Sequence, residues 1–266
     1  MVEAKDQLSL THFRKGAWLS IVSSLIAIAL LIGYIYWQQS IYVLASAQEH
    51  GDHTYFLSDL FDVERGGLKR QLPFPLYVGQ ELYYTHNCEY PEQPAMIKFS
   101  TGRIQYPRKV YLLLNLQEGF ATRRGQSVNG RRIGAIAFEF DVVTGDRFRY
   151  YDLIAGVDVR EWLIGVTTEE HITTTLSPMT EEIYRSNVPS KENLTAVLDL
   201  VTLDIPLDAP NAPLVGVWII DDTLNALNDC APGLQIADVV IEAPRGTTIT
   251  ENDFIKMNNR VFRPPE

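Results

Sequence analysis

The chain has 266 residues and a formal net charge of −10 at pH 7, because 33 acidic side chains outnumber 23 basic ones. This excess excludes a nucleic-acid-binding protein, which needs a basic face, and it opposes docking flat on an anionic membrane. Val, Ile, Tyr and Phe are frequent, and Gly and Pro recur at short intervals, a composition that indicates mainly β structure.

Residues 17–37 form an uncharged stretch that predicts a transmembrane helix. At a rise of about 1.5 Å per residue, such a helix reaches roughly 30 Å, the thickness of a hydrocarbon core. Trp18 at one end, with Tyr34, Tyr36 and Trp37 at the other, fits the aromatic belts of membrane helices. A buried core helix is the alternative, but it should be polar on at least one face, and only three serines interrupt this run.

The flanking charges predict the orientation of this helix. Residues 1–16 contain three basic side chains, whereas no Lys or Arg follows the helix before Arg65. The positive-inside bias places residues 1–16 in the cytoplasm and the bulk of the chain outside the plasma or inner membrane, in the periplasmic or extracellular space. A cleavable signal peptide is the alternative, since Ala45-Ser46-Ala47 resembles a cleavage site, but the apolar run is longer than a signal peptide needs.

Residues 38–75 are expected to form a tether, whose first apolar residues, 41–44, could extend the helix. The pair Gly66-Gly67 and the prolines on either side of Phe74 then favour an extended connection. For residues 76–266 we expect one extracytoplasmic β-sandwich domain of jelly-roll type.

Period-two patterns and turn residues mark the strands of this domain. Lys109–Asn115 is an almost continuous apolar run, which suits a central strand buried on both faces. Asn129-Gly130 and Thr144-Gly145-Asp146 predict turns before and after a strand at Arg132–Phe140. The other expected elements are strands at Leu76–Tyr84, Ala95–Phe99, Arg147–Asp152, His171–Leu176, Leu194–Ile205, Leu214–Ile220 and Leu234–Glu242, and a short helical turn at Asp222–Asn228.

The two cysteines, Cys88 and Cys230, are expected to form a disulfide, because the compartment outside the cytoplasmic membrane is oxidising. In the chain-entropy model, closing a loop of about 140 residues stabilises the fold by roughly 5 kcal/mol. Two free buried thiols are the alternative. A metal site is not expected, because neither cysteine has a CxxC partner.

Several segments carry a resemblance to a known family. They are, in chain order, Lys109–Asn115, Gly130–Phe138, Tyr151–Trp162, Thr202–Pro206, Leu214–Ile220 and Leu234–Ile241. In this order they resemble bacterial extracytoplasmic β-sandwich modules of galactose-binding-like, jelly-roll type. The resemblance covers about half of the chain. It implies a binding or assembly module and implies no chemistry.

The stretch from Gly156 to Trp162 has two interpretations. In the structural one, Gly156 allows a tight turn, Trp162 plugs the edge of the sandwich, and Arg160 pairs with Asp158 or Asp152. In the functional one, an exposed Trp162 beside Asp158 and Arg160 stacks on a sugar ring and bonds its hydroxyl groups. The structural interpretation is the commoner outcome for such a motif.

A basic cluster stands out on this acidic domain. Its members flank the expected turn at Gly130 and are Arg123, Arg124, Arg131 and Arg132. Arginine suits bidentate contacts to carboxylates or phosphates, so we expect this cluster to contact an acidic partner protein or an anionic glycan. A solvated hairpin tip is the alternative.

Two further groups of residues are candidates for contacts. The small residues Ser20, Ser23, Ser24 and Ala27 would permit close packing of the membrane helix on partner helices. Calcium is the one cofactor considered, with candidate ligands in Asp199, Asp204, Asp221 and Asp222, although no loop has the spaced carboxylates of a dedicated site.

Catalytic signatures are absent: the chain has no GxSxG, HExxH, P-loop or GxGxxG motif, and Glu181-Glu182 is interpreted as a solvated pair. We therefore expect no enzyme activity. The expected function is a non-catalytic, single-pass membrane-anchored accessory or structural subunit of a membrane or cell-envelope protein complex, with membrane proteins as partners. The alternative is a membrane-tethered carbohydrate-binding module.

Overall fold

The computed structural model describes residues 21–36, 38–47, 55–56, 67–68, 72, 74, 81–87, 90–117, 130–164, 176–188, 191–223, 232–247, 249–250 and 261–262. The chain divides into two compact units. The first consists of Met1–Ser40 with Pro244–Gly246, and the second of Ile41–Ala243 with Thr247–Glu266.

The first unit contains a helical segment, residues 21–36 and residue 38, and Thr223 of the second unit is also helical. Among the described residues, no helix is both long and apolar enough to cross a membrane. Residues 17–20 and Trp37 of the predicted span lie outside the described residues. At the end of the helix, the Arg245 amide donates to the Gln39 carbonyl at 2.6 Å, and the Arg245 guanidinium lies 5.3 Å from the centre of the Tyr36 ring.

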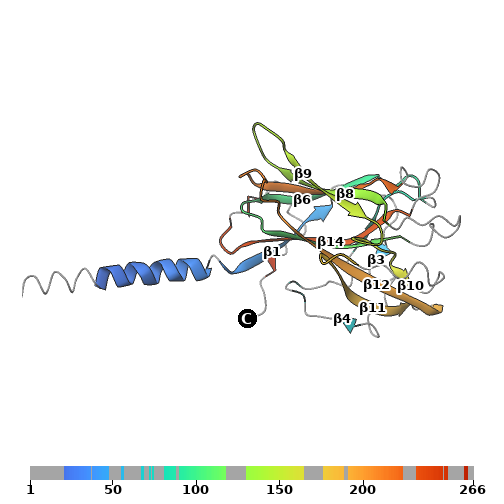
Figure 1. Ribbon diagram of the computed structural model, residues 1–266, viewed down its shortest axis with the longest axis horizontal. Coiled ribbons are helices and arrows are strands. Elements are labelled where there is room, and N and C mark those ends of the chain that lie inside the picture. Colours follow the sequence, from blue (N-terminus) through green and yellow to red (C-terminus); the bar gives the residue numbers. More distant parts are fainter. Residues whose placement is uncertain are drawn as a thin grey trace, which may run out of the picture. The chain divides into compact units, whose positions relative to one another are not determined.

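The second unit is built from two antiparallel sheets (Figure 1). The larger sheet contains β1 (Ser40–Leu44), β3 (Tyr55–Phe56), β4 (Gly67–Leu68), β5 (Glu81–Tyr84), β7 (Lys109–Leu116), β10 (Leu163–Ile164), β11 (Thr180–Val188), β12 (Lys191–Asp204), β14 (Leu234–Pro244) and β16 (Val261–Phe262). Its order is β16-β1-β14-β7-β12-β11-β4, with β5 beside β14, β3 beside β5 and β10 beside β12.

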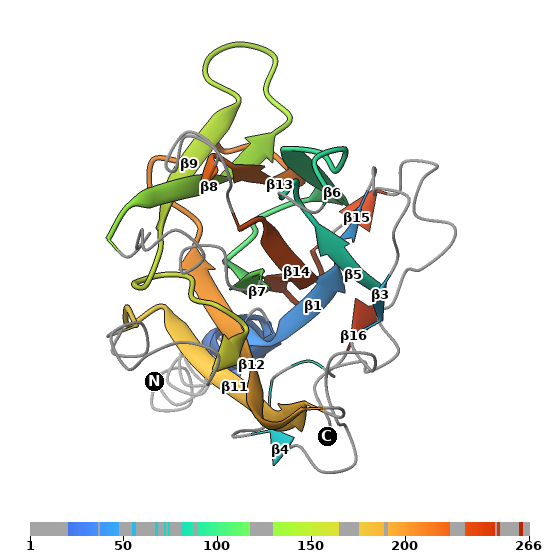
Figure 2. The ribbon, with the colours of Figure 1, turned by 90° about the vertical axis from the view of Figure 1, so that its right-hand side faces the viewer.

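The smaller sheet has six strands in the described chain. They are β2 (Ser46–Ala47), β6 (Met96–Ile104), β8 (Arg132–Phe140), β9 (Phe148–Ile154), β13 (Leu214–Asp221) and β15 (Ile249–Thr250). Their order is β15-β6-β13-β8-β9, with β2 beside β6. In Figure 2 the strands of the smaller sheet β6, β13, β8 and β9 lie above β14 and β7 of the larger one.

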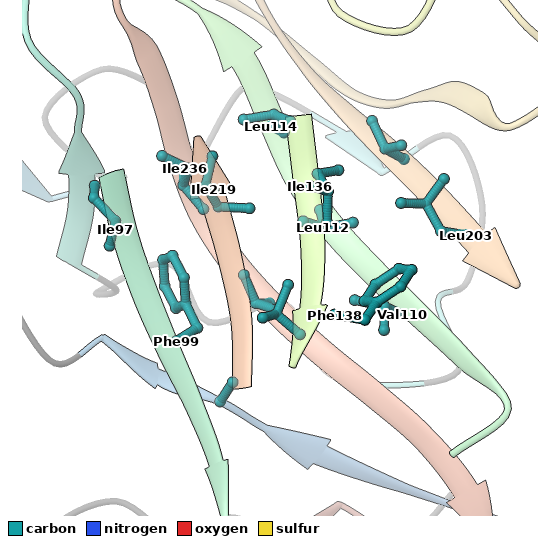
Figure 3. Close-up of a cluster of buried hydrophobic side chains, with 14 of the residues drawn as sticks. Ile97, Phe99, Val110, Leu112, Leu114, Ile136, Phe138, Leu203, Ile219 and Ile236 are labelled. Carbon is teal, nitrogen blue, oxygen red and sulfur yellow. The ribbon is translucent and has the colours of Figure 1, made fainter. Parts of the chain in front are cut away.

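Apolar side chains from both sheets meet in one core, so the two sheets pack in a β-sandwich-like arrangement, which we call the sandwich (Figure 3). The larger sheet contributes Val110, Leu112, Leu114, Leu203 and Ile236, and the smaller one contributes Ile97, Phe99, Ile136, Phe138 and Ile219. All of them are almost fully buried. The expectation of a mainly β fold is confirmed, and burial of alternate side chains accounts for the period-two pattern along β6 and β13.

The larger sheet is covered on its other face as well. A second cluster there includes Leu72 and Phe74 from the segment before β5, and Trp162 and Leu163 from the segment around β10. β7 lies between β14 and β12, and its side chains are buried on both faces because one cluster covers each face of the sheet. This confirms the central strand expected from the apolar run of Lys109–Asn115.

Residues 41–44 do not extend the helix, so that expectation is wrong. They belong to β1, where Val43 enters the core between the sheets and Tyr42 enters the second cluster. Tyr42 packs there on Phe74 and Tyr111, with ring centres 6.0 and 6.1 Å away. Residues 41–47 of the expected tether therefore belong to β1 and β2 of the sandwich. Successive side chains of β1 are buried in the two hydrophobic clusters on opposite faces of the larger sheet.

β11 is the longest of the described strands that have no counterpart in the sequence expectations. β11 pairs with β12, and a register shift between Glu182 and Tyr184 breaks its alternation. Both Ile183 and Tyr184 are buried as a result, so the period-two pattern is lost. Of the strand expected at His171–Leu176, residues 171–175 lie outside the described residues, and Leu176 is not in a strand.

Candidate functional site

Buried polar side chains gather at one end of the sandwich, which we call the Leu116 end. There β7 ends at Leu116 opposite the first residue of β14, Leu234, and β13 ends at Asp221 opposite Gly134 of β8. The opposite end, where β1 begins and β14 ends, is called the Ile41 end.

A polar cluster at the Leu116 end joins the two sheets. The Thr85 hydroxyl donates to Asp221 Oδ2, and the hydroxyl oxygen of Thr85 accepts from the Leu234 amide at 2.6 Å. Gln117 Nε2 donates to the carbonyls of Thr85 and Leu234, both at 3.1 Å. Thr223 donates to Asp221 Oδ1 through its amide at 2.8 Å and its hydroxyl at 2.6 Å. The cluster thereby fixes the ends of β5, β13 and β14.

Burial raises the pKa of Asp221, and the hydrogen bonds from Thr223 and Thr85 and the nearby His86 only partly oppose this effect. The carboxyl is thus costly to keep ionised in the folded chain. His86 is also buried, and its Nε2 has no hydrogen-bond partner among the described residues. The described contacts place no hydroxyl group on His86, so they do not assemble a nucleophile with a base.

Replacing Asp221 with Asn tests this electrostatic cost. The folded carboxyl binds a proton at a higher pH than the unfolded one, so wild-type stability rises relative to Asp221→Asn as the pH falls through the raised pKa toward 3.8. Above the raised pKa the difference is constant. Chemical denaturation of both proteins between pH 8 and pH 4 measures it. A difference that does not change with pH would contradict the assignment.

An ionic network links the segment before β10 to β11 and β12. Arg160 donates through Nε and Nη2 to the two oxygens of Asp199, each at 2.8 Å, and through Nη2 to Glu182 at 2.7 Å. Asn115 donates to Asp199 Oδ2 at 3.1 Å, and Arg185 donates to both oxygens of Glu182 at 2.7 Å. The carboxylates of Asp199 and Glu182 raise the pKa of Arg160 although burial opposes this. Its charge is therefore permanent.

This network and the burial of Trp162 favour the structural interpretation of residues 156–162. Gly156 has φ of +74°, which supports the expected tight turn, and Trp162 is only 7% exposed. Arg160 pairs with Asp199 and Glu182 and not with Asp158 or Asp152, so that expectation is corrected. The reason is the fold, which brings β11 and β12 beside the turn. The indole has no open face for a sugar ring in this arrangement.

Asp158 makes hydrogen bonds within its own turn and does not pair with Arg160. Its Oδ2 accepts the Ile154 amide at 3.0 Å, and its Oδ1 accepts the Tyr151 hydroxyl at 3.4 Å. Its carbonyl accepts the hydroxyl of Thr180 at 2.7 Å. Partial burial and the Asp158 carboxylate raise the pKa of Tyr151 to about 12. Asp158 thus closes the turn after β9 and ties it to β11.

Half of the predicted arginine cluster can be placed. Arg123 and Arg124 lie outside the described residues, whereas Arg131 and Arg132 are exposed at the start of β8. Arg132 donates to Asp152 at 2.6 Å and to Asp222 at 2.5 Å, and these bonds raise its pKa. Its guanidinium is therefore engaged within the chain.

The calcium candidates are also separated by the fold. Asp199 contacts Arg160 and Asp222 contacts Arg132, while Asp204 lies 3.5 Å from Lys109 and Asp221 belongs to the polar cluster. No group of three or more His, Cys, Asp or Glu side chains in the described residues could hold a metal ion. Glu182, interpreted as solvated, is instead largely buried in the Arg160 network.

The remaining candidates lie at the cysteines and the helix. Cys88 and Cys230 lie outside the described residues, so the disulfide stays a prediction. Their described neighbours run side by side, since the Thr85 amide donates to the Leu234 carbonyl at 3.0 Å. Ser20 is also outside, whereas Ser23, Ser24 and Ala27 lie in the helical segment with exposed side chains.

The sequence analysis did not predict that the residues of the polar cluster, or those of the ionic network, lie together. Their members are spread over more than a hundred residues, from Thr85 to Leu234, and only the strand order brings them together. The polar residues Asn115 and Asp199, each inside an apolar strand, were the available signal, because a buried polar group needs a partner.

Comparison with known proteins adds no relative. A scan against models of protein families matches none, and a search of the curated proteins finds no match. The functional conclusion therefore rests on the geometry of the chain itself.

Proposed function

We propose that the chain is a non-catalytic, single-pass membrane-anchored subunit of a membrane or cell-envelope complex. The observation that carries this proposal is the helical segment 21–36, whose side chains are exposed on every face. The exposed residues include Ile21, Val22, Leu25, Ile26, Ile28, Leu30, Leu31, Ile32 and Ile35.

Such a segment is unfavourable in water. Burying one Leu or Ile side chain is worth about 1.5–3 kcal/mol, and this helix carries a run of exposed Leu and Ile side chains. A bilayer, or partner helices within it, would cover all faces at once. Tyr34 and Tyr36 at the C-terminal end support an interfacial position there. The basic residues before the helix support a cytoplasmic N-terminus.

The strand order supports the jelly-roll part of the proposal. Taken as eight principal strands, β1-β14-β7-β12 form one sheet and β6-β13-β8-β9 the other. Numbered along the chain, this is the order 1-8-3-6 facing 2-7-4-5, which is the winding of a jelly roll. Modules of this type serve widely in binding and assembly, which agrees with the resemblance noted in the sequence.

The contacts of Arg160, Arg132 and Trp162 support a structural role for these residues and not a catalytic or glycan-binding one. The guanidinium groups of Arg160 and Arg132 donate hydrogen bonds to carboxylates of the same chain. The buried Trp162 offers no stacking surface, which makes the carbohydrate-binding alternative the weaker one.

Membrane extraction tests the anchor. The wild-type chain is expected to stay in the membrane fraction after an alkaline carbonate wash, whereas Ile28→Lys, at the centre of the helix, is expected to be washed off. A Lys at the centre of a membrane helix costs about 2.5–3.5 kcal/mol on insertion scales. Ile28→Leu is the matched control and should behave as wild type. Release of the wild-type chain would reject the anchor.

Native sizing in mild detergent tests the partnership. We expect the solubilised chain to migrate in a complex much larger than its own 30.1 kDa. A monomer that is retained on envelope polysaccharide would favour the carbohydrate-binding alternative, and a monomer that is not retained would reject both.

A further inference from the structure

Three turns at the Ile41 end of the sandwich each carry a large hydrophobic side chain into solvent. The turn between β6 and β7 carries Tyr106, 56% exposed, and the hairpin turn between β8 and β9 carries Val143, fully exposed. The connection from β12 to β13 carries Leu207, which is also fully exposed. Large apolar side chains exposed at three turns of the same end are unfavourable in water.

Contacts between these turns hold them together. Arg103 at the end of β6 pairs with Asp141 at the end of β8. The Ile205 amide donates to the Arg108 carbonyl at 3.0 Å. Arg149 donates to the Asp208 carbonyl at 2.9 Å, beside Leu207, so it ties the second turn to the third. These contacts link the three turns into one rim.

Backbone strain marks the first of these tips. Tyr106 has φ of +53°, and it is the single non-glycine residue with positive φ in the described chain. That conformation costs a residue with a Cβ roughly 1–2 kcal/mol. The strain holds an aromatic side chain outward at a turn, where glycine would be cheaper. Strained residues of this kind concentrate at functional surfaces.

Charge is distributed unevenly between the two ends of the sandwich. Among the described residues, the Ile41 end carries six basic side chains (Arg103, Arg108, Lys109, Arg147, Arg149 and Arg245) and five acidic ones (Asp141, Asp146, Asp204, Asp208 and Glu242), whereas the whole chain has a net charge of −10. The described part of the rim therefore has no net negative charge. The repulsion from anionic lipid that the total charge implies does not apply to this end.

The chain length limits how far this rim can lie from the helix. Ile41, at the start of the sandwich unit, follows Tyr36 by five residues. Five extended residues span at most about 18 Å. The polar headgroup layer of one leaflet is roughly 5–8 Å thick. A bilayer around the helix would lie within reach of the Ile41 end.

We infer that Tyr106, Val143 and Leu207 insert into the interfacial region of the bilayer that holds the helix. This inference rests on the membrane anchor proposed above. Tyrosine and aliphatic side chains partition favourably at that depth, and the rim has no net negative charge that anionic lipid would repel. The contact would fix the orientation of the sandwich and leave its Leu116 end facing away from the membrane.

Quenching by brominated lipid tests the contact in the full chain. Val143→Trp and Leu207→Trp are reconstituted in vesicles of phosphatidylcholine and phosphatidylglycerol brominated near the top of the acyl chain. Val157→Trp is the control, because Val157 is exposed at the Leu116 end. After subtraction of the wild-type signal, the tryptophans at 143 and 207 should lose emission in brominated vesicles, and that at 157 should not.

Flotation of the same vesicles separates the two ideas. If the wild-type chain does not float with the vesicles after a carbonate wash, both the anchor and the lipid contact are overturned. If it floats but the tryptophans at 143 and 207 are quenched no more than the one at 157, the anchor stands and the lipid contact is overturned. Both substituted side chains are exposed, so the variants are expected to fold.

Discussion

Arg160→Ala is expected to lower the free energy of unfolding by about 3–5 kcal/mol. The side chain of Asp199 is completely buried, and two of its three described charged or polar contacts come from Arg160. Without the guanidinium, the carboxylate keeps one hydrogen bond from Asn115 and no opposite charge in direct contact. Removing one partner of a buried pair costs more than the pair itself contributes, because an uncompensated charge remains. Urea denaturation followed by circular dichroism measures the loss.

A control for this prediction lies in the same network. Arg185 contacts Glu182 as closely as Arg160 does, but its side chain is 46% exposed. Arg185→Ala should therefore cost no more than about 1 kcal/mol. The double change Arg160→Met with Asp199→Leu should recover most of the loss, because it removes both charges and keeps the volume. Equal losses from Arg160→Ala and Arg185→Ala would show that burial of the network does not matter.

The sequence was sufficient for the strands whose patterns are regular. β7, β8, β13 and β14 lie where apolar alternation or a continuous apolar run placed them. The turn at Gly145 also follows the expectation, with φ of +93° between β8 and β9. In these segments the local pattern and the packing of the sandwich favour the same structure.

The sequence did not predict a strand that is buried on both faces or one whose alternation is broken by a register shift. Ile41–Leu44 is apolar at each position, which suits a helix extension as well as a strand buried on both faces. The register shift in β11 removed its alternation. The partner of Arg160 was chosen among nearby residues, Asp152 and Asp158, whereas the true partners follow it by 22 and 39 residues. Local spacing carries no information about such pairs.

Gly134→Ala is expected to destabilise the sandwich by roughly 3 kcal/mol, at the upper end of the usual cost of overpacking. A Cβ on Gly134 would overlap the carbonyl oxygen of Ile220 and lie 3.5 Å from the Cα of Asp221. Both neighbours are backbone atoms of β13, so no side-chain rotation relieves the overlap. Gly134 also follows a register shift in the pairing of β8 with β9, where the strand bends. To make room for the added methyl group, β8 and β13 must separate where Gly134 pairs with Asp221.

Gly145→Ala provides the comparison, since no heavy atom lies within 4 Å of the Cβ it would add. That change adds only the strain of a positive φ, about 1–2 kcal/mol. The melting temperatures of the two variants compare the cost of the overlap at Gly134 with the cost of the positive φ at Gly145. Gly134→Ala should also reduce the dependence of stability on the Asp221 carboxyl, because the shifted β13 loosens the bonds from Thr85 and Thr223. If Gly134→Ala unfolds at the wild-type temperature, the close approach of β8 and β13 is not a constraint on the fold.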